Sequence, residues 1–73
     1  MSISYKPLWK LAIDKEINKT TLRDMANISN QTLSKLSKDE YVSLEIIDRI
    51  CSCLDCNIEE VIMHIKDEEE IYD

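Results

Sequence analysis

Apolar residues in this chain recur at intervals of three and four, the spacing that places side chains on one face of an α-helix. The pattern appears in five segments, which begin near Tyr5, Asn18, Ser29, Ser43 and Ile58. No segment shows the alternation of a β-strand over a useful length, and only Ile3 and Tyr5 are compatible with a short extended arm. The sequence therefore predicts an all-α fold of about five short helices joined by loops of about two to six residues.

The length of 73 residues limits the chain to one small domain with a single core. Hydrophobic residues at 44% and charged residues at 33% fit a soluble globular protein. No apolar run approaches the roughly 20 residues of a membrane span, and the N-terminus lacks the apolar region of a signal peptide. We therefore expect a cytoplasmic protein. Residues 1–66 are expected to fold as a domain, and residues 67–73, with five acids among seven positions, to form an acidic C-terminal tail.

The third helical segment has an unusual outer surface. Leu33 and Leu36 are its only large apolar residues, and the other positions are polar and uncharged apart from Lys35. A face that is merely solvated normally carries mixed Glu and Lys. We therefore expect a narrow apolar stripe that anchors this helix and a wide outer face that offers amide, hydroxyl and ammonium groups to a partner.

The second and third segments are separated only by Asn27, Ile28 and Ser29. So short a connection requires the first helix to stop sharply and the next to leave at a large angle. Asn27 suits the stop because Asn adopts the left-handed backbone more readily than most non-glycine residues. Ile28 can then enter the core, and Ser29 can cap the next helix. The two helical segments and this short connection together form a helix-turn-helix pattern.

These residues resemble a known family. Residues 18–36, NKTTLRDMANISNQTLSKL, are similar to the core of the phage-repressor and Cro-type helix-turn-helix family, the XRE group of bacterial regulators. Residues 43–51 and 54–61 are similar to the family's fourth helix, turn and fifth helix, so the resemblance covers roughly residues 5–66. It rests on order, spacing and caps together. It implies a compact five-helix, lambda-repressor-like DNA-binding domain whose third helix lies in the major groove.

The resemblance also implies roles for individual residues, carried over by position. The residues expected to face or flank base edges are Asn30, Gln31, Thr32, Ser34 and Lys35. Those expected to meet phosphate are Lys19, Ser29 and Lys38. The chemistry agrees, because Asn and Gln can pair with adenine and Lys can donate to guanine, each contact discriminating by about 1–3 kcal/mol.

The sequence departs from the family at a few positions. Arg23 stands where the family usually has a small residue, and its stem is expected to extend outward. Ser37 replaces a common Glu, and Asp39 and Asp55 stand where the family often has Gly. Since the chain contains no glycine, the sharp turns are expected at Asn27, Asp39 and Asp55, which tolerate the left-handed backbone.

The formal net charge of −6 speaks at first against a nucleic-acid partner. The charges are unevenly distributed, however. Residues 1–38 carry seven bases and three acids, whereas residues 39–73 carry two bases and twelve acids. The local field governs a contact surface, so the basic half remains suited to DNA while the acidic half is expected to point away from it.

The cysteines, the single histidine and the rest of the sequence do not indicate a metal site or a catalytic site. Cys51, Cys53 and Cys56 are an odd number for disulfides and are expected to be reduced thiols that pack as small hydrophobes rather than zinc ligands. His64 is expected to be a surface residue of the last helix. A catalytic site needs a pocket with convergent groups, and nothing in the sequence suggests one. We expect no enzyme activity, cofactor, bound metal, membrane contact or small-molecule ligand.

Two hypotheses for function follow. The first is a sequence-specific, DNA-binding transcriptional regulator of the repressor type that binds double-stranded DNA, most simply as a homodimer on two half-sites. The alternative is a protein-interaction module that retains the helix-turn-helix fold without useful DNA affinity, for which the acidic second half is the best support.

Overall fold

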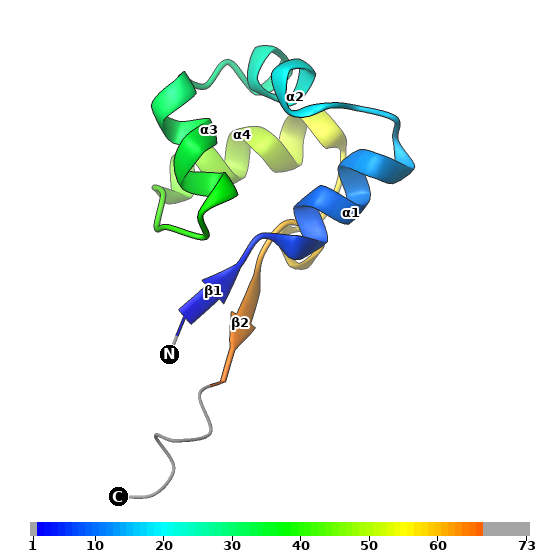
Figure 1. Ribbon diagram of the computed structural model, residues 1–73. Coiled ribbons are helices and arrows are strands. Elements are labelled where there is room, and N and C mark those ends of the chain that lie inside the picture. Colours follow the sequence, from blue (N-terminus) through cyan, green and yellow to red (C-terminus); the bar gives the residue numbers. More distant parts are fainter. Residues whose placement is uncertain (1, 67–73) are drawn as a thin grey trace, which may run out of the picture.

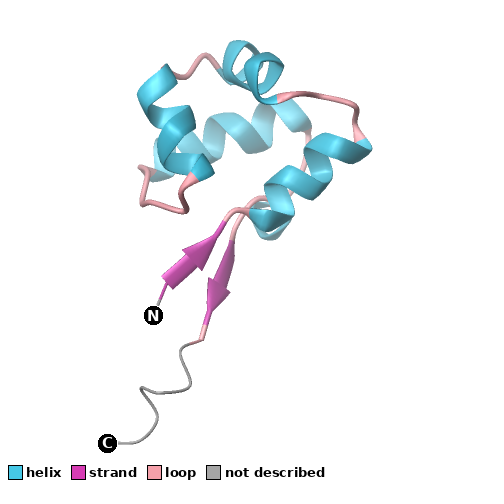
Figure 2. Cartoon of the chain, in the orientation of Figure 1, coloured by secondary structure: helices cyan, strands magenta, loops and turns pink. Residues whose placement is uncertain are grey.

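The computed structural model describes residues 2–66, which form a mostly helical domain with a small two-stranded sheet (Figures 1 and 2). In chain order the elements are β1 (Ser2–Ser4), α1 (Lys6–Asp14), α2 (Lys19–Ala26), α3 (Asn30–Ser37), α4 (Leu44–Leu54), the short 3₁₀ helix η1 (Ile58–Glu60) and β2 (Met63–Ile65). The predicted acidic tail, residues 67–73, lies outside the described residues. Within residues 2–66, no helix combines the length and apolar character that a membrane crossing requires.

The predicted fifth α-helix is wrong, and so is the purely α fold class: the described residues contain four α-helices. The segment begins at Ile58 as expected, but η1 has only three residues, and β2 follows it. β2 pairs antiparallel with β1, with Ile3 opposite His64. The segment is rich in Ile and Val, whose branched side chains favour extended backbone, and an isolated short helix is marginal. His64 is therefore exposed on a strand instead of on a helix.

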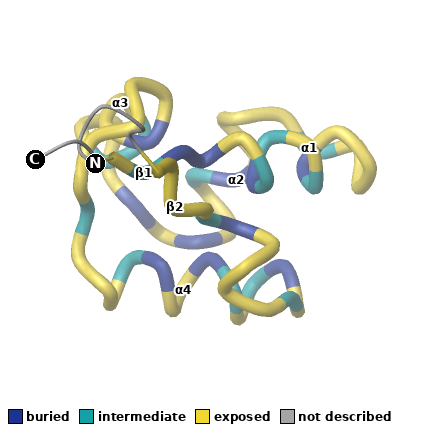
Figure 3. The backbone as a smooth tube through the Cα atoms, turned by 90° about the horizontal axis from the view of Figure 1, so that it is seen from below, coloured by how far each residue is buried: buried dark blue, intermediate teal, exposed yellow. Residues whose placement is uncertain are grey.

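The core is built from one to three side chains of each α-helix and from side chains of the segments that flank them. Leu8, Leu22, Leu36, Ile50 and Val61 are fully buried. In Figure 3 the buried residues of α4 lie on its side toward the rest of the domain, whereas most of α3 is exposed. Full burial of a Leu or Ile side chain contributes about 1.5–3 kcal/mol, so α3 is held to the domain chiefly through Leu36.

Three of the α-helices have a side-chain N-cap, which confirms the cap expected at Ser29. In each of them the side-chain oxygen of the residue before the helix accepts a hydrogen bond from the backbone N–H three positions on. These residues are Asn18, Ser29 and Ser43, at 2.7, 3.1 and 3.3 Å. Each such cap typically contributes about 1 kcal/mol, which helps to fix where these short helices start. Asn18 therefore caps α2, which begins at Lys19.

The sharp turns occur where they were expected, with one addition. Asn27, Asp39 and Asp55 have φ values of 56°, 58° and 53°, which confirms the three predicted left-handed positions. Glu16, between α1 and α2, has φ of 58° and was not predicted. A left-handed residue with a Cβ atom costs roughly 1–2 kcal/mol, and Glu lacks the short polar side chain that eases this cost for Asn and Asp.

Tyr5 connects the start of α1 to the loop that follows α3. Its ring is fully buried, and its hydroxyl donates to the carbonyl oxygen of Glu40 at 2.8 Å. Its backbone N–H donates to Oδ1 of Asp39 at 2.9 Å. Burial raises the pKa of the Tyr5 hydroxyl above its ordinary value. Asp39 thus has two roles: its backbone makes the left-handed turn after α3, and its carboxylate holds the end of α3 against the N-terminal segment.

Candidate nucleic-acid interface

The orientation of α3 follows from the turn that precedes it. Asn27 ends α2 in the left-handed conformation, and its carbonyl oxygen accepts a hydrogen bond from Nη1 of Arg49 at 3.1 Å. Ile28 is buried beneath the turn, and Leu36 is buried eight residues further on, near the end of α3. Because these side chains face inward, the opposite side of α3 faces solvent over its whole length (Figure 3).

The structure places most of the predicted base-reading residues together on this outer side. Asn30, Gln31, Ser34 and Lys35 are exposed, and their spacing along the helix puts them on one face. Thr32 differs, because it is half-buried and its hydroxyl oxygen accepts a hydrogen bond from the Ser29 hydroxyl at 3.1 Å. The exposed four offer two amides, a hydroxyl and an ammonium group, which can donate to and accept from base edges.

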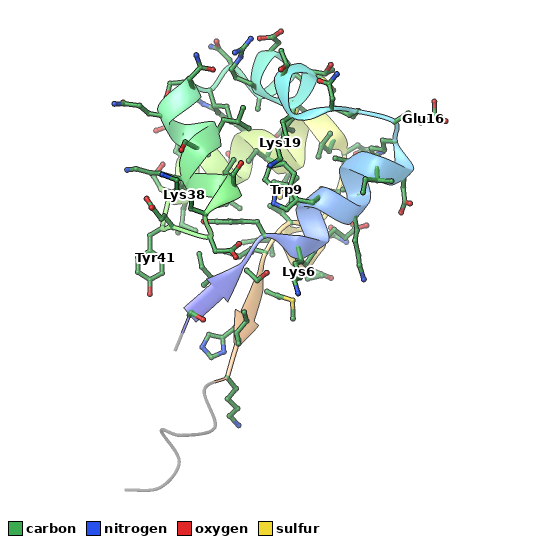
Figure 4. The ribbon with its side chains drawn as sticks, in the orientation of Figure 1. Lys6, Trp9, Glu16, Lys19, Lys38 and Tyr41 are labelled. Carbon is green, nitrogen blue, oxygen red and sulfur yellow. The ribbon has the colours of Figure 1, made fainter. Side chains whose placement is uncertain are left out.

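The three residues predicted to meet phosphate lie around this face. Ser29 is exposed at the N-terminus of α3, where its hydroxyl caps the helix and the first backbone N–H groups point toward any bound anion. Lys38 follows the C-terminus of α3 and is exposed. Lys19, at the start of α2, is also exposed (Figure 4). The predicted phosphate contacts therefore frame the outer face of α3.

Lys19 is held in place by two neighbours that the sequence did not assign to the site. Its ammonium nitrogen lies 4.7 Å from the centre of the Trp9 ring, a cation–π contact between α2 and α1. It also donates to Oγ of Ser37 at 3.1 Å. Figure 4 shows Trp9 and Lys19 side by side between α1 and α2. No periodicity in the sequence links residues 9, 19 and 37, so only the folded arrangement shows this cluster.

Arg23 extends to the exposed side chains of Asn30 and Asp24, and its head group makes contacts that the sequence did not predict. Its Nη1 donates to Oδ1 of Asn30, the first residue of α3, at 2.7 Å. Its Nε donates to Oδ1 of Asp24 at 3.1 Å, and 30% of its side chain is exposed. Arg23, one of the residues that depart from the family pattern, therefore bridges the two helices of the motif beside a predicted base-reading side chain.

The three cysteines pack against the core as partly buried side chains. Cys53 donates from Sγ to the carbonyl oxygen of Ile50 at 3.4 Å. Burial raises the pKa of the Cys53 thiol, and burial together with the neighbouring Cys51 raises that of Cys56 to about 11. No cluster of three or more His, Cys, Asp or Glu residues in the part of the chain that the structure describes could hold a metal ion.

The four helices, the tight turn and the exposed polar α3 define a helix-turn-helix domain. Comparison with known proteins identifies it further: residues 7–67 match the Cro/C1-type HTH DNA-binding domain family. The chain therefore belongs to the Cro/C1-type helix-turn-helix family of DNA-binding domains, which confirms the resemblance seen in the sequence.

One solved structure supports this assignment. The transcriptional regulator VanUg, in its crystal form II, is 38% identical and superimposes with a TM-score of 0.87, over 90% of this chain and 88% of that one. Among curated proteins, no significant match is found.

Proposed function

We propose that this protein is a sequence-specific transcriptional regulator of the repressor type, which reads the major groove of double-stranded DNA with α3. The observation that carries the proposal is the exposed polar face of α3, where Asn30, Gln31, Ser34 and Lys35 stand together without acidic residues among them. Membership of a DNA-binding family supports it, as does the similarity to a structure described as a transcriptional regulator.

In this proposal the exposed residues of α3 contact bases, and the residues around them contact phosphate. Gln31 and Lys35 are exposed about one helical turn apart on the outer face and supply most of the sequence choice. Thr32 contributes less than the other base-reading residues, since its hydroxyl already bonds to Ser29. Lys19, Ser29 and Lys38 set the register of the protein on the duplex through its backbone.

We also propose that residues 1–66 form the DNA-binding unit and that it acts as a homodimer. A single module makes a small interface, and two modules related by a two-fold axis match half-sites about 34 Å apart. The acidic second half of the chain supports the same orientation on DNA, because residues 39–73 carry twelve acids and two bases, which the phosphate backbone repels.

The test is a titration of labelled genomic and random-sequence DNA at several salt concentrations. DNA binding predicts that affinity falls steeply as salt rises. Gln31→Ala and Lys35→Ala should relax the choice of sequence, whereas Lys19→Ala should weaken binding to all sequences alike. Lys66→Ala is the matched control, because it removes the same charge after β2, outside the helix-turn-helix motif.

The alternative function is a protein-interaction module with the same fold. Its support is the strongly acidic composition after residue 38. Absence of DNA binding at low salt, where phosphate contacts are strongest, would reject the regulator and favour this alternative. If Gln31→Ala, Lys35→Ala and Lys19→Ala instead lost the same affinity for every DNA sequence, our division into base-reading and phosphate-binding residues would be rejected.

A further inference from the structure

The contact between Arg23 and Asn30 joins the two helices of the motif at the edge of the proposed DNA-reading face. Arg23 lies in the last turns of α2, and Asn30 is the first residue of α3. The distance of 2.7 Å between Nη1 and Oδ1 is shorter than the usual N–H···O distance of about 2.9–3.0 Å. Hydrogen bonds from a charged donor are typically short and about twice as strong as neutral ones.

The identity of the donor fixes which way the Asn30 amide points. A guanidinium group has only donors, so it can face only the carbonyl oxygen of an amide and not its NH₂ group. The Asn30 oxygen is therefore turned toward α2, and the NH₂ group is turned away from Arg23. An unrestrained Asn side chain can rotate to present either group, and this one is held in a single orientation.

Arg23 is itself restrained. Nε and Nη2 both lie 3.1 Å from Oδ1 of Asp24, so the planar guanidinium is held on one side by Asp24 and on the other by Asn30. Arg23 is half-buried but Asp24 is exposed, so solvent screens the ion pair and it adds little to stability. Its effect is geometric, since it keeps the guanidinium where it meets the Asn30 oxygen.

We infer that Arg23 is a positioning residue that makes Asn30 act on DNA as a hydrogen-bond donor, and that the operator therefore carries guanine, rather than adenine, opposite Asn30. This inference rests on the proposed function. Pairing with adenine requires the amide oxygen to accept from N6 while NH₂ donates to N7, whereas guanine offers two acceptors, N7 and O6. With its oxygen held toward Arg23 on α2, Asn30 has its NH₂ group left to face the DNA, and this donor matches the acceptor pair.

The test compares base preferences of the full chain and of Arg23→Met, selected from a random DNA pool. Met keeps the length and helix propensity of the side chain but cannot donate. Wild type should select guanine at one base pair, and replacing that base by 7-deazaguanine should weaken binding about 10-fold. Arg23→Met should admit adenine at the same pair, with its affinity relative to guanine rising about 10-fold.

Two further variants separate positioning from other roles. Asn30→Ala should remove the preference at that pair whether residue 23 is Arg or Met, because Arg23 acts through Asn30. Arg23→Lys retains the charge and should keep affinity while allowing adenine in part, since a single ammonium is a less directional donor. The preference that depends on Lys35 should be unchanged in all of them.

Several outcomes overturn the inference. Selection of adenine by the wild type at the pair that depends on Asn30 is one. An equal loss of affinity of Arg23→Met for all sequences, which would mark Arg23 as a phosphate contact, is another. The third is measured without DNA: the side-chain NH₂ resonances of Asn30 should shift in Arg23→Met, and unchanged resonances would show that the contact does not hold the amide. If those resonances shift but the wild type binds no DNA, the proposed function fails instead.

Discussion

The ammonium group of Lys19 lies 4.7 Å from the centre of the Trp9 ring and also donates to the Ser37 hydroxyl, so one side chain connects α1, α2 and α3. Each partner restrains the long Lys side chain, which otherwise loses rotamer entropy when it meets a phosphate. A residue prepared in this way binds its partner at a lower entropic cost. These two contacts hold the ammonium group of Lys19 in place, although the residue is exposed.

We predict that Trp9→Leu weakens DNA binding about 2- to 5-fold, through loss of the cation–π contact that orients Lys19. The loss should be the same for specific and random DNA, because a phosphate contact carries no sequence information. When Trp9→Leu is introduced into the Lys19→Ala variant, it should cause no further loss of DNA affinity. The measurement is a double-mutant cycle by fluorescence anisotropy, with thermal unfolding of each variant as the control for folding. Additive losses would contradict the prediction.

Tyr5→Phe should lower the free energy of unfolding by about 1 kcal/mol, because it removes the hydrogen bond from the buried hydroxyl to the Glu40 carbonyl. Tyr41→Phe is the matched control, since 74% of Tyr41 is exposed and its change should be near zero. Urea unfolding followed by Trp9 fluorescence measures both. A Tyr5→Phe chain as stable as wild type would show that the link between the N-terminal segment and the loop after α3 is not needed.

Alkaline pH should destabilise the wild type through the same residue. Burial raises the pKa of Tyr5 in the folded state above its ordinary value of 10.0, so the folded state holds this proton more tightly than the unfolded state. Its contribution is then complete below about pH 10 and decreases as pH rises through the folded pKa. Stability measured between neutral pH and strongly alkaline pH should fall less steeply in Tyr5→Phe, and equal slopes would contradict the assignment.

Glu16→Gly should stabilise the domain by about 1 kcal/mol, because Glu16 is exposed and has φ of 58°, a value that Gly adopts without a steric cost. Lys15→Gly, one position earlier at φ of −90°, is the control and should not stabilise. Thermal unfolding is the measurement. If Glu16→Gly were less stable than the wild type, the Glu16 side chain would have to stabilise the folded state by more than its backbone angle costs.

Cys56 should react slowly with iodoacetamide at neutral pH, since the thiolate is the nucleophile and its pKa is raised to about 11. The rate should rise with pH until about that value. Cys56→Ser identifies the corresponding phase in the time course, and mass spectrometry of the peptides checks the assignment. Rapid modification of Cys56 at pH 7 would contradict the burial of this thiol against the core.

The helix-turn-helix motif was predictable because its determinants are local. The cap at Ser29, the left-handed turn at Asn27 and the spacing of Leu33 and Leu36 all lie within a few residues of the structure they specify. Local signals of this kind place helix starts and stops. The same reasoning identified the exposed face of α3, whose reading of DNA stays a prediction.

Two features that the sequence did not predict have non-local causes. The segment after Ile58 has helical spacing, but β2 forms because β1, about sixty positions earlier, offers a strand to pair with. The residue type of Arg23 departs visibly from the family pattern, yet its contact with Asn30 depends on the angle between two helices. The turn at Glu16 has a different cause: nothing about this residue type marks a left-handed backbone, so the sequence does not predict it.

The pairing of β1 with β2 places Ser2 opposite Ile65, so the two ends of the described chain leave the domain side by side, on the side away from α2 (Figure 1). Directly paired residues of antiparallel strands are only about 5 Å apart. The domain could therefore be grafted into a surface loop of another protein through two adjacent junctions. A fluorophore or fusion partner attached at either end would extend from this same corner of the molecule.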